Sequence, residues 1–224
     1  KYNLVAVPVV DSIGRLVGRI TVDDVMDEVR EQAERDYQLA SGLSQDVETD
    51  DSVFRQTTAR LPWLLIGMLG GIGNSMILGN FDSTFAAHPE MALYIPLIGG
   101  TGGNVGTQSS ALVVQGLANS SLDANNTWKQ ILKESVVALI NATIISMLVY
   151  VYNFIRFGAT ATVSYSVSLS LFAVVMFASI FGTLVPMTLE KMKIDPAIAT
   201  GPFISITNDI IGMLLYMGIT VMLS

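Results

Sequence analysis

Long apolar stretches follow one another from residue 61 to the end of the chain, and they constrain its fold more than any other feature. They cover residues 61 to 80, 91 to 118, 131 to 155, 167 to 189 and 196 to 223. A helix of about 20 apolar residues crosses the hydrocarbon core of a bilayer. Only 14% of the residues are charged, against about 25% in average soluble proteins. The sequence therefore predicts an all-α membrane protein with five transmembrane helices per chain.

The basic residues between these stretches predict the orientation of the chain. Cytoplasmic loops of membrane proteins carry an excess of Lys and Arg. With the N-terminus inside, the outer connections carry only Arg156. The inner connections then carry Arg55, Arg60, Lys129, Lys133, Lys191 and Lys193. We expect a multi-pass protein of the inner or plasma membrane, surrounded by the lipid bilayer, with a cytoplasmic N-terminus and a C-terminus outside.

The segment before residue 61 has a different character. Two short runs, residues 4 to 10 and 16 to 21, are rich in β-branched residues and flank a turn sequence, which predicts two strands. Residues 22 to 43 then place apolar side chains at helical spacing with acidic residues along another side. We predict a short α/β remnant at 1–24, an acidic helix and linker at 25–52, and the membrane domain at 53–224. Because the chain opens inside a predicted strand without Met, we expect it to be a fragment of a longer protein.

The residue types restrict the chemistry that this chain can carry out. It contains no cysteine and one histidine, His88, so a metal ion would have to be held by oxygen ligands. Hard cations are favoured by such ligands. The net charge is −7, which argues against a nucleic-acid partner.

Asp209 is the strongest candidate for a functional residue. It lies about halfway along the last apolar stretch, which contains no basic residue to neutralise it. An isolated charge in mid-membrane is costly, so an ionisable residue there is by default a functional candidate. A cation is the obvious partner. The structural alternative is a protonated Asp209 that only hydrogen-bonds a neighbouring helix.

Two other ionisable residues have simpler interpretations. Glu134 lies one turn into the third stretch beside Lys133, where its side chain can reach the inner interface, so we expect it to be structural. His88 lies in a short outer loop before Pro89, with no second His or Cys near it in the sequence. We expect it to be a solvated loop residue.

The second stretch is rich in glycine and polar residues between Pro96 and Ser110. Glycines let helices approach closely, and an irregular backbone would also free carbonyl groups. Such a backbone is tolerated at membrane depth only against protein or water. This pattern predicts a pore lining on one face, with a packing seam as the alternative. We assign the lining, beside Asp209, to Asn208, Ser205, Gly102 and Asn104.

Magnesium fits these oxygen ligands. Mg²⁺ gives up its water reluctantly, so a few carboxylate and carbonyl oxygens around a hydrated ion suit it better than a dry cage. One Asp in each chain supplies only one carboxylate for such an ion. A two-fold homodimer would bring two copies of Asp209 to the axis.

The same residues resemble those of the MgtE family of magnesium channels and transporters. The resemblance rests on the run from Pro96 to Gln108, with its Gly-Asn-x-Gly centre, and on Asp195-Pro196-Ala197 and Gly201-Pro202 ahead of Asn208-Asp209. Residues 7 to 11 and 16 to 25 look like the end of a CBS domain, and the acidic helix looks like the plug helix of that family. The match covers essentially the whole chain.

The resemblance implies a homodimeric channel with its pore at the dimer interface and Asp209 as the pore carboxylate. It also implies that cytoplasmic Mg²⁺, bound between the acidic helix and the membrane domain, holds the pore shut. Mg²⁺ would then be both the transported and the regulatory ion, and the chain would carry it into the cytoplasm. The positions suited to the regulatory role are Asp23, Asp24, Asp27, Glu31, Glu34, Asp36 and Asp195.

Other classes of function fit the sequence less well. A proton- or sodium-coupled exchanger of divalent cations is the main alternative, but it would need a second buried ionisable group. A membrane-anchored regulatory protein would not need Asp209 or the Gly-Asn-rich stretch. A metallohydrolase would want His or paired carboxylates, so we expect no enzymatic activity.

Overall fold

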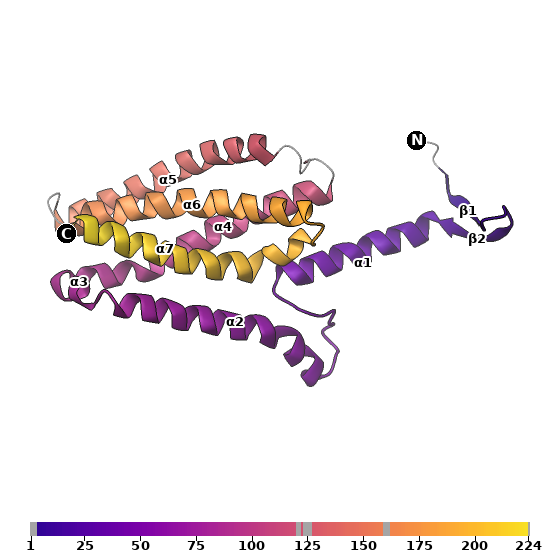
Figure 1. Ribbon diagram of the computed structural model, residues 1–224, viewed down its shortest axis with the longest axis horizontal. Helices are drawn as coiled ribbons and strands as arrows, with labels where there is room; N and C mark the ends of the chain where they lie inside the picture. Colours follow the sequence, from indigo (N-terminus) through magenta and orange to yellow (C-terminus); the bar gives the residue numbers. More distant parts are fainter. Residues whose placement is uncertain (1–3, 120–121, 123–126, 159–161, 224) are drawn as a thin grey trace.

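The computed structural model describes residues 4–119, 122, 127–158 and 162–223. It is a bundle of long helices from which one helix projects as an arm, with a small two-stranded sheet at the far end of that arm (Figure 1). The helical architecture that the sequence predicts is therefore present, and the strands are confined to the predicted N-terminal segment.

The sheet is a hairpin of β1 (Ala6–Val10) and β2 (Leu16–Thr21), which pair antiparallel. Between them, the Asp11 carboxylate accepts hydrogen bonds from the amides of Ile13 at 3.0 Å and Arg15 at 2.9 Å, which closes the turn. Gly14 takes a φ of 81°, a conformation that glycine adopts at little cost. The hairpin buries none of its apolar side chains, and two strands alone are at best marginally stable.

The arm is α1 (Val22–Ala40), and its first turn explains where it begins. The Thr21 hydroxyl accepts from the Asp24 amide, while the Asp24 carboxylate accepts from the Thr21 amide at 2.7 Å, which is a capping box. No residue of α1 is buried. Beyond the helix, Gly42 at φ 82° turns the chain toward the bundle.

The bundle is built around α6 (Thr162–Lys191), which packs against α4 (Ile95–Ala118), α5 (Thr127–Phe157) and α7 (Gly201–Leu223). The helix α2 (Val53–Gly79) lies at the periphery and contacts α7. Short segments connect these helices: α3 (Asp82–Ala87), the 3₁₀ helix η1 (Pro89–Tyr94) and the 3₁₀ helix η3 (Pro196–Ala199).

Within the described residues, α2, α5, α6 and α7 are long and apolar enough to cross a membrane, judged by length and composition. The helix α4 has 24 residues, which is sufficient length, but its glycine and polar residues keep it outside this group. Four of the five predicted spans are thus supported as membrane-crossing helices. The remaining predicted span, at 91–118, contains the helix α4, which packs against α6 and α7.

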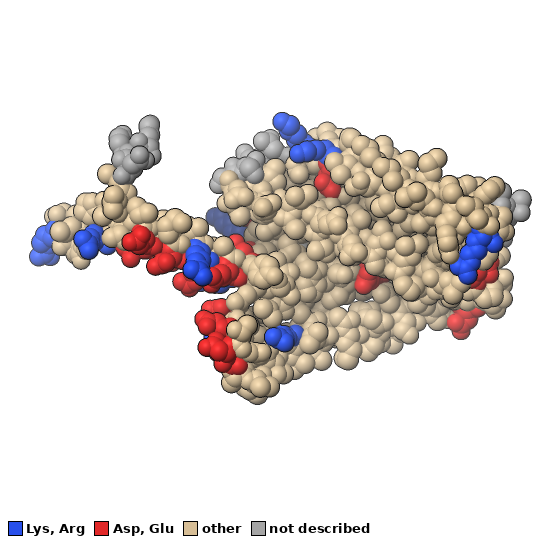
Figure 2. Space-filling view, turned by 180° about the vertical axis from the view of Figure 1, so that it is seen from behind, with Lys and Arg blue, Asp and Glu red and all other residues tan. Residues whose placement is uncertain are grey.

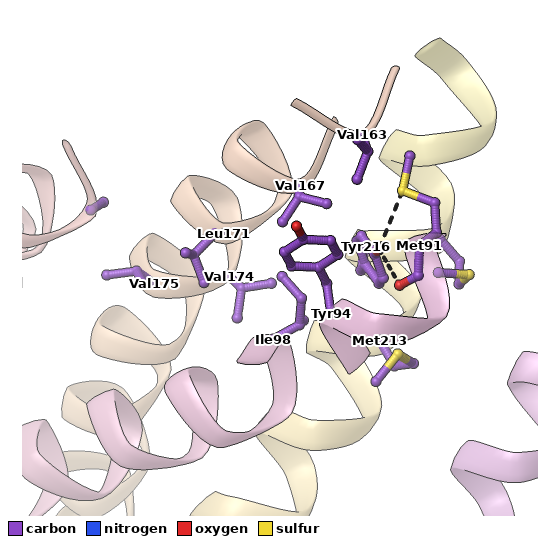
Figure 3. Close-up of a cluster of buried hydrophobic side chains, with 12 residues drawn as sticks. Met91, Tyr94, Ile98, Val163, Val167, Leu171, Val174, Val175, Met213 and Tyr216 are labelled. Carbon is purple, nitrogen blue, oxygen red and sulfur yellow. Dashed lines mark hydrogen bonds between the residues drawn. The ribbon is translucent and has the colours of Figure 1, made fainter. Parts of the chain in front are cut away.

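A buried cluster joins η1 and the adjoining ends of α4, α6 and α7 (Figure 3). Tyr216 lies at its centre and is fully buried, and its hydroxyl donates to the Met91 carbonyl at 2.8 Å. Tyr94, at the end of η1, donates to the Asn153 side chain of α5. Buried tyrosines normally find such partners, because an unpaired hydroxyl in an apolar core is costly. The cluster therefore fixes η1, and with it the start of α4.

Farther along α4, Gly106 is a point where three helices meet. A Cβ on Gly106 would overlap the Asn208 side-chain amide of α7, and a Cβ on Gly182 of α6 would overlap the Gly106 carbonyl. Of the two uses of these glycines that the sequence allowed, close helix approach and an irregular backbone, the second is absent, because α4 is continuously helical from Ile95 to Ala118. Its glycines are used for close approach of neighbouring helices instead.

Candidate cation site

Asp209 lies in the third turn of α7 and borders a polar cavity of about 320 Å³. The cavity is formed between three helices, with α2 on one side and α4 and α7 on the others. It is lined by Asn74, Ile95, Pro96, Gly99, Gly100, Gly103, Asn104, Ser205, Asp209 and Met213. The structure therefore brings together three of the predicted pore residues, which are Asp209, Ser205 and Asn104.

The wall of α4 that faces Asp209 has almost no side chains. A Cβ on Gly99 would lie 3.4 Å from an Asp209 carboxylate oxygen, and one on Gly103 would lie 2.8 Å from the Ser205 hydroxyl. Glycine at both positions leaves backbone and empty space opposite the carboxylate. The Asp209 carboxylate therefore borders the cavity without a side chain from α4 in front of it.

The cavity offers Asp209 no positive partner. None of the residues that line it is Lys, Arg or His. In the described part of the chain, no hydrogen bond or ion pair to the Asp209 carboxylate is found either. A carboxylate at membrane depth is stable only when it is protonated, paired or bound to a cation. This arrangement is suited to a hydrated cation, which brings its own charge and its own hydrogen-bond donors.

Two of the predicted lining residues lie elsewhere. Asn208 is 1% exposed and points into the contact between α7 and α4, where its amide donates to the Gly102 carbonyl at 3.4 Å. A Cβ on Gly102 would lie 2.9 Å from Val174 of α6. Gly102 and Asn208 thus face the helix-packing seam behind the cavity, and their contribution to a pore lining stays a prediction.

Asn74 is a candidate that our sequence analysis missed. It comes from α2 and lines the same cavity, and its side-chain oxygen is buried without a hydrogen-bond partner. An amide oxygen of this kind is a ligand that hard cations accept. The signal was present in the sequence as a lone carboxamide inside an otherwise apolar span, flanked by Gly73 and Ser75.

The predicted regulatory acids are spread along the arm. Figure 2 shows the red acidic side chains following the projecting helix, in contrast to a bundle surface with few charges. Several already have partners: Thr21 hydrogen bonds hold the pKa of Asp24 below its usual value, and Arg30 Nε lies 3.0 Å from Glu34. The first and last of these acids, Asp23 and Asp36, are separated by about 20 Å along a helix that rises 1.5 Å per residue.

The last of these acids, Asp36, shares a cavity with Asp195. A hollow of about 450 Å³ between the end of α1 and the bundle is lined by Gln32, Asp36, Val114, Leu117, Ala118, Glu190, Lys193, Ile194, Asp195 and Pro196. Across the described ranges, no three His, Cys, Asp or Glu side chains are grouped so that they could hold a metal ion together. A single chain therefore places Asp36 and Asp195 near each other but does not complete a cage of carboxylates.

The end of α1 is tightly joined to the start of α7. Gly201 has a φ of 49°, and a Cβ on it would overlap the Ala40 carbonyl oxygen. A Cβ on Gly42 would lie 2.6 Å from the Pro202 ring. Asp209 follows eight residues later on the same helix, about 12 Å from this junction. The arm is thus mechanically connected to the helix that carries the candidate pore carboxylate.

Two expectations about other ionisable residues need correction. Glu134 is 9% exposed and does not extend to the interface, because serines on two neighbouring helices donate hydrogen bonds to it. Besides Asp209, Glu134 is therefore a second ionisable group inside the bundle, and the sequence analysis did not predict its burial. His88 is partly buried rather than fully solvated, with its Nδ1 atom 3.5 Å from a Glu90 oxygen.

Comparison with known proteins gives a consistent picture. Residues 95–219 match the model of the MgtE family, described as divalent cation transporter. The chain is 33% identical over 219 residues to "Magnesium transporter MgtE" of Bacillus subtilis, covering 98% of this chain and 48% of that protein. It is also 33% identical over 224 residues to the protein of that name in Thermus thermophilus, covering 97% and 48%. The chain spans about half the length of these curated relatives.

Proposed function

The chain belongs to the MgtE family of divalent cation transporters, and we propose that it carries Mg²⁺ across the cell membrane into the cytoplasm, along a path that passes Asp209. The observation that supports this most is a mid-span carboxylate without a basic partner, bordering a cavity with a glycine wall. Its relatives are named as transporters rather than enzymes, and we propose no catalytic role for any residue.

The chemistry of the cavity is suited to a hydrated Mg²⁺ ion. Mg²⁺ keeps several of its waters and is held through one or two carboxylates rather than by a complete protein cage. A water molecule occupies about 30 Å³ in the liquid, so six waters need about 180 Å³. The cavity measures about 320 Å³. We propose that Asp209 contacts the ion's water shell, with Asn104, Ser205 and Asn74 accepting hydrogen bonds from it. Asn208 and Gly102 would hold α7 against α4 behind this lining.

We propose that the conducting unit is a homodimer with the pore at its two-fold interface. Gly100 and Asn104 line the cavity and are exposed in the single chain, so its mouth is uncovered on that side. A second copy related by a two-fold axis would close the path and contribute a second Asp209. Two carboxylates facing one axis would give a divalent cation the charge that a single chain lacks.

We propose that α4 is the second of five spans, with the N-terminus in the cytoplasm and the C-terminus outside. Its packing against α6 and α7 supports a crossing at the same depth. Glycine and polar residues are accepted in a span that lines a water-filled path. The distribution of Lys and Arg among the connections supports the orientation.

We propose that cytoplasmic Mg²⁺ regulates the pore through α1. Clustered carboxylates repel one another until a divalent cation bridges them, so ion concentration can bias the position of the arm. The hollow that Asp36 shares with Asp195, and the tight contact between Ala40 and Gly201, support this role. The exposed apolar hairpin is what we expect of the end of a CBS domain whose remaining surface would cover it.

Mg²⁺ influx into liposomes tests the pore assignment. We expect Asp209→Asn and Asp209→Ala to abolish influx, while Asp82→Asn, which removes an exposed acid on α3, leaves it unchanged. Size-exclusion profiles and thermal unfolding of each variant separate loss of the ion path from loss of the fold. If Asp209→Asn conducts Mg²⁺ like the parent, Asp209 is structural and the proposal is wrong.

A pH-sensitive dye in the same liposomes discriminates a channel from a coupled exchanger. We expect Mg²⁺ entry without opposing proton movement, and no dependence on a Na⁺ gradient. Proton or Na⁺ movement in fixed proportion to Mg²⁺ entry would contradict the channel.

Cross-linking tests the dimer, because the chain contains no cysteine that would interfere. A single cysteine introduced close to a two-fold axis can form a disulfide with the same cysteine of the second chain. We expect Ser205→Cys, on the cavity wall, to cross-link in membranes, and Met147→Cys, exposed on α5, to remain monomeric under the same oxidant. The opposite pattern would place the interface on α5.

A further inference from the structure

Glu134 is the most deeply buried carboxylate among the described residues, and its surroundings form a second polar site. The Ser109 hydroxyl of α4 donates to Glu134 Oε1 at 2.6 Å, and the Ser179 hydroxyl of α6 donates to the same oxygen. The two hydroxyl oxygens lie 3.0 Å apart. Glu134 itself comes from α5, so three helices each contribute one oxygen to this cluster.

The cluster opens into a cavity that is larger than the one beside Asp209. Its volume is about 510 Å³. Besides Glu134, Ser109 and Ser179, its wall carries five carboxamide side chains: Gln108, Gln115, Asn119, Gln130 and Asn141. Polar side chains are rare in membrane spans and mark ion or substrate sites when they line a cavity.

The two cavities lie on different sides of α4. Gly103 faces Asp209, and Ser109 faces Glu134; six residues apart on a helix, they are separated by about 120° around its axis. The residues that line the two cavities do not overlap. The Glu134 cluster is therefore separate from the proposed ion path.

Among the described residues, Glu134 has no ion-pair partner within 4.0 Å. Lys133 also lines the cavity, but among the described residues no ion pair joins it to Glu134 within 4.0 Å. One oxygen of Glu134 has two lone pairs and accepts both hydroxyl hydrogen bonds. Buried charges in proteins are paired or bind metal ions. When both hydroxyls donate to Glu134, neither donates across the 3.0 Å contact between them, and each serine oxygen keeps lone pairs for a cation.

We propose that Glu134, Ser109 and Ser179 form a second cation site that holds a hydrated divalent ion of the Mg²⁺ class. With one carboxylate, the site cannot replace the whole hydration shell, so the ion keeps most of its water. Those waters need acceptors, and the carboxamide oxygens around the cavity supply them. The site does not depend on the transport proposal, because it lies outside the Asp209 cavity.

Mn²⁺ is the probe, because it substitutes for Mg²⁺ and its binding is counted by electron paramagnetic resonance on the purified chain. We expect Glu134→Gln to lose one bound Mn²⁺ per chain, and Asp209→Asn to retain that ion. Ser109→Ala combined with Ser179→Ala removes the two hydroxyls but keeps the carboxylate, and we expect its affinity to fall about 10- to 100-fold. Thermal unfolding without metal serves as the folding control.

A second measurement needs no change at position 134. In Asp209→Asn protein, Mg²⁺ addition should shift a carboxylate infrared band, and the serine double variant should reduce that shift. The proposal is overturned if Glu134→Gln binds Mn²⁺ with the stoichiometry and affinity of the parent. It is equally overturned if no carboxylate band responds to Mg²⁺, because Glu134 would then be a protonated structural residue. Neither result bears on whether Asp209→Asn blocks influx.

Discussion

Gly201 lies against the carbonyl oxygen of Ala40, with no room for a Cβ between them. This contact joins the end of the acidic arm to the first residue of the helix that carries Asp209. Because Gly201 also has a φ of 49°, its backbone conformation and its packing both require glycine. Together with the contact between Gly42 and Pro202, Gly201 holds α1 in its position relative to the bundle.

We predict that Gly201→Ala loosens the arm. A side chain at a positive φ costs about 1–3 kcal/mol, and its overlap with Ala40 is relieved only by moving α1 away from α7. Spin labels on α1 and α5, introduced at single cysteines, should give a broader distance distribution in the variant. Gly71→Ala is the control, because no atom lies within 4 Å of its added Cβ. An unchanged distribution in Gly201→Ala would contradict the contact.

The contact between Gly106 and Asn208 predicts coupling between two substitutions. Gly106→Ala should destabilise the bundle by about 1–3 kcal/mol, as overpacking does. Truncating the partner with Asn208→Ala removes the overlap of the added methyl group with the Asn208 amide and leaves only its contact with Ile204 Cγ2 at 2.8 Å. We therefore expect the double variant to be less destabilised than the sum of the single ones.

Unfolding of the four proteins in detergent measures this coupling. Gly182→Ala provides the contrast, because its Cβ meets the Gly106 backbone rather than a side chain. Asn208→Ala should not rescue it. Additive effects for the pair Gly106→Ala and Asn208→Ala would rule out the proposed packing.

Tyr216→Phe tests the buried cluster of Figure 3. The substitution removes the hydroxyl that donates to the Met91 carbonyl and leaves that carbonyl without its partner. We expect a loss of about 1–3 kcal/mol in the free energy of unfolding. Tyr152→Phe is the matched control, since the Tyr152 hydroxyl accepts from Arg156 at an exposed position and should contribute little. Equal effects would mean that the Tyr216 hydrogen bond is not formed.

The capping box of α1 predicts a pH dependence with a definite sign. Hydrogen bonds from the Thr21 side chain and amide lower the pKa of Asp24 from 3.8. A carboxyl whose pKa is lower in the folded state stabilises that state above its unfolded pKa, and this stabilisation is lost as pH falls through the folded pKa. The first turn of α1 should therefore weaken below the ordinary pKa of Asp.

Nuclear magnetic resonance titration of the Asp24 carboxyl checks this directly. We expect a midpoint below 3.8 in the parent and a return toward that value in Thr21→Val, which removes the hydroxyl. A parent midpoint at or above 3.8 would be incompatible with the capping box.

Local patterns explain which features could be predicted from the sequence. The hairpin, the acidic helix and the apolar stretches each follow from the spacing of neighbouring residues, and Asp209 was identified because it is alone in an apolar span. The exact rotation of α7 was not predictable, since Ser205, Asn208 and Asp209 stand at i, i+3 and i+4 and so share one polar face in the sequence pattern. Hence Asn208 and Asp209 could not be assigned to the seam and to the cavity. The burial of Glu134 depends on serines 25 and 45 residues away.

The glycine wall opposite Asp209 gives the sharpest test of the ion path. Gly100 and Gly103 both line the cavity, but an added Cβ meets no atom within 4 Å at Gly100 and lies 2.8 Å from the Ser205 hydroxyl at Gly103. We therefore expect Gly103→Ala to reduce Mg²⁺ influx at least tenfold, which corresponds to about 1.4 kcal/mol or more. Because Gly100 lies at the proposed dimer interface, the control is Gly71→Ala on α2, where an added Cβ also meets no atom within 4 Å, and we expect it to leave influx within twofold of the parent.

If the two variants unfold at the same temperature, a change in stability does not explain the difference in influx, because both add one methyl group to a helix of the bundle. Adding Ser205→Gly to Gly103→Ala removes the hydroxyl that the new Cβ meets, and influx should then recover. Recovery would show that space beside Asp209 limits the passage of the ion. If both glycine variants conduct like the parent, the ion does not pass along this wall, and Asp209 would have to act from another face of α7.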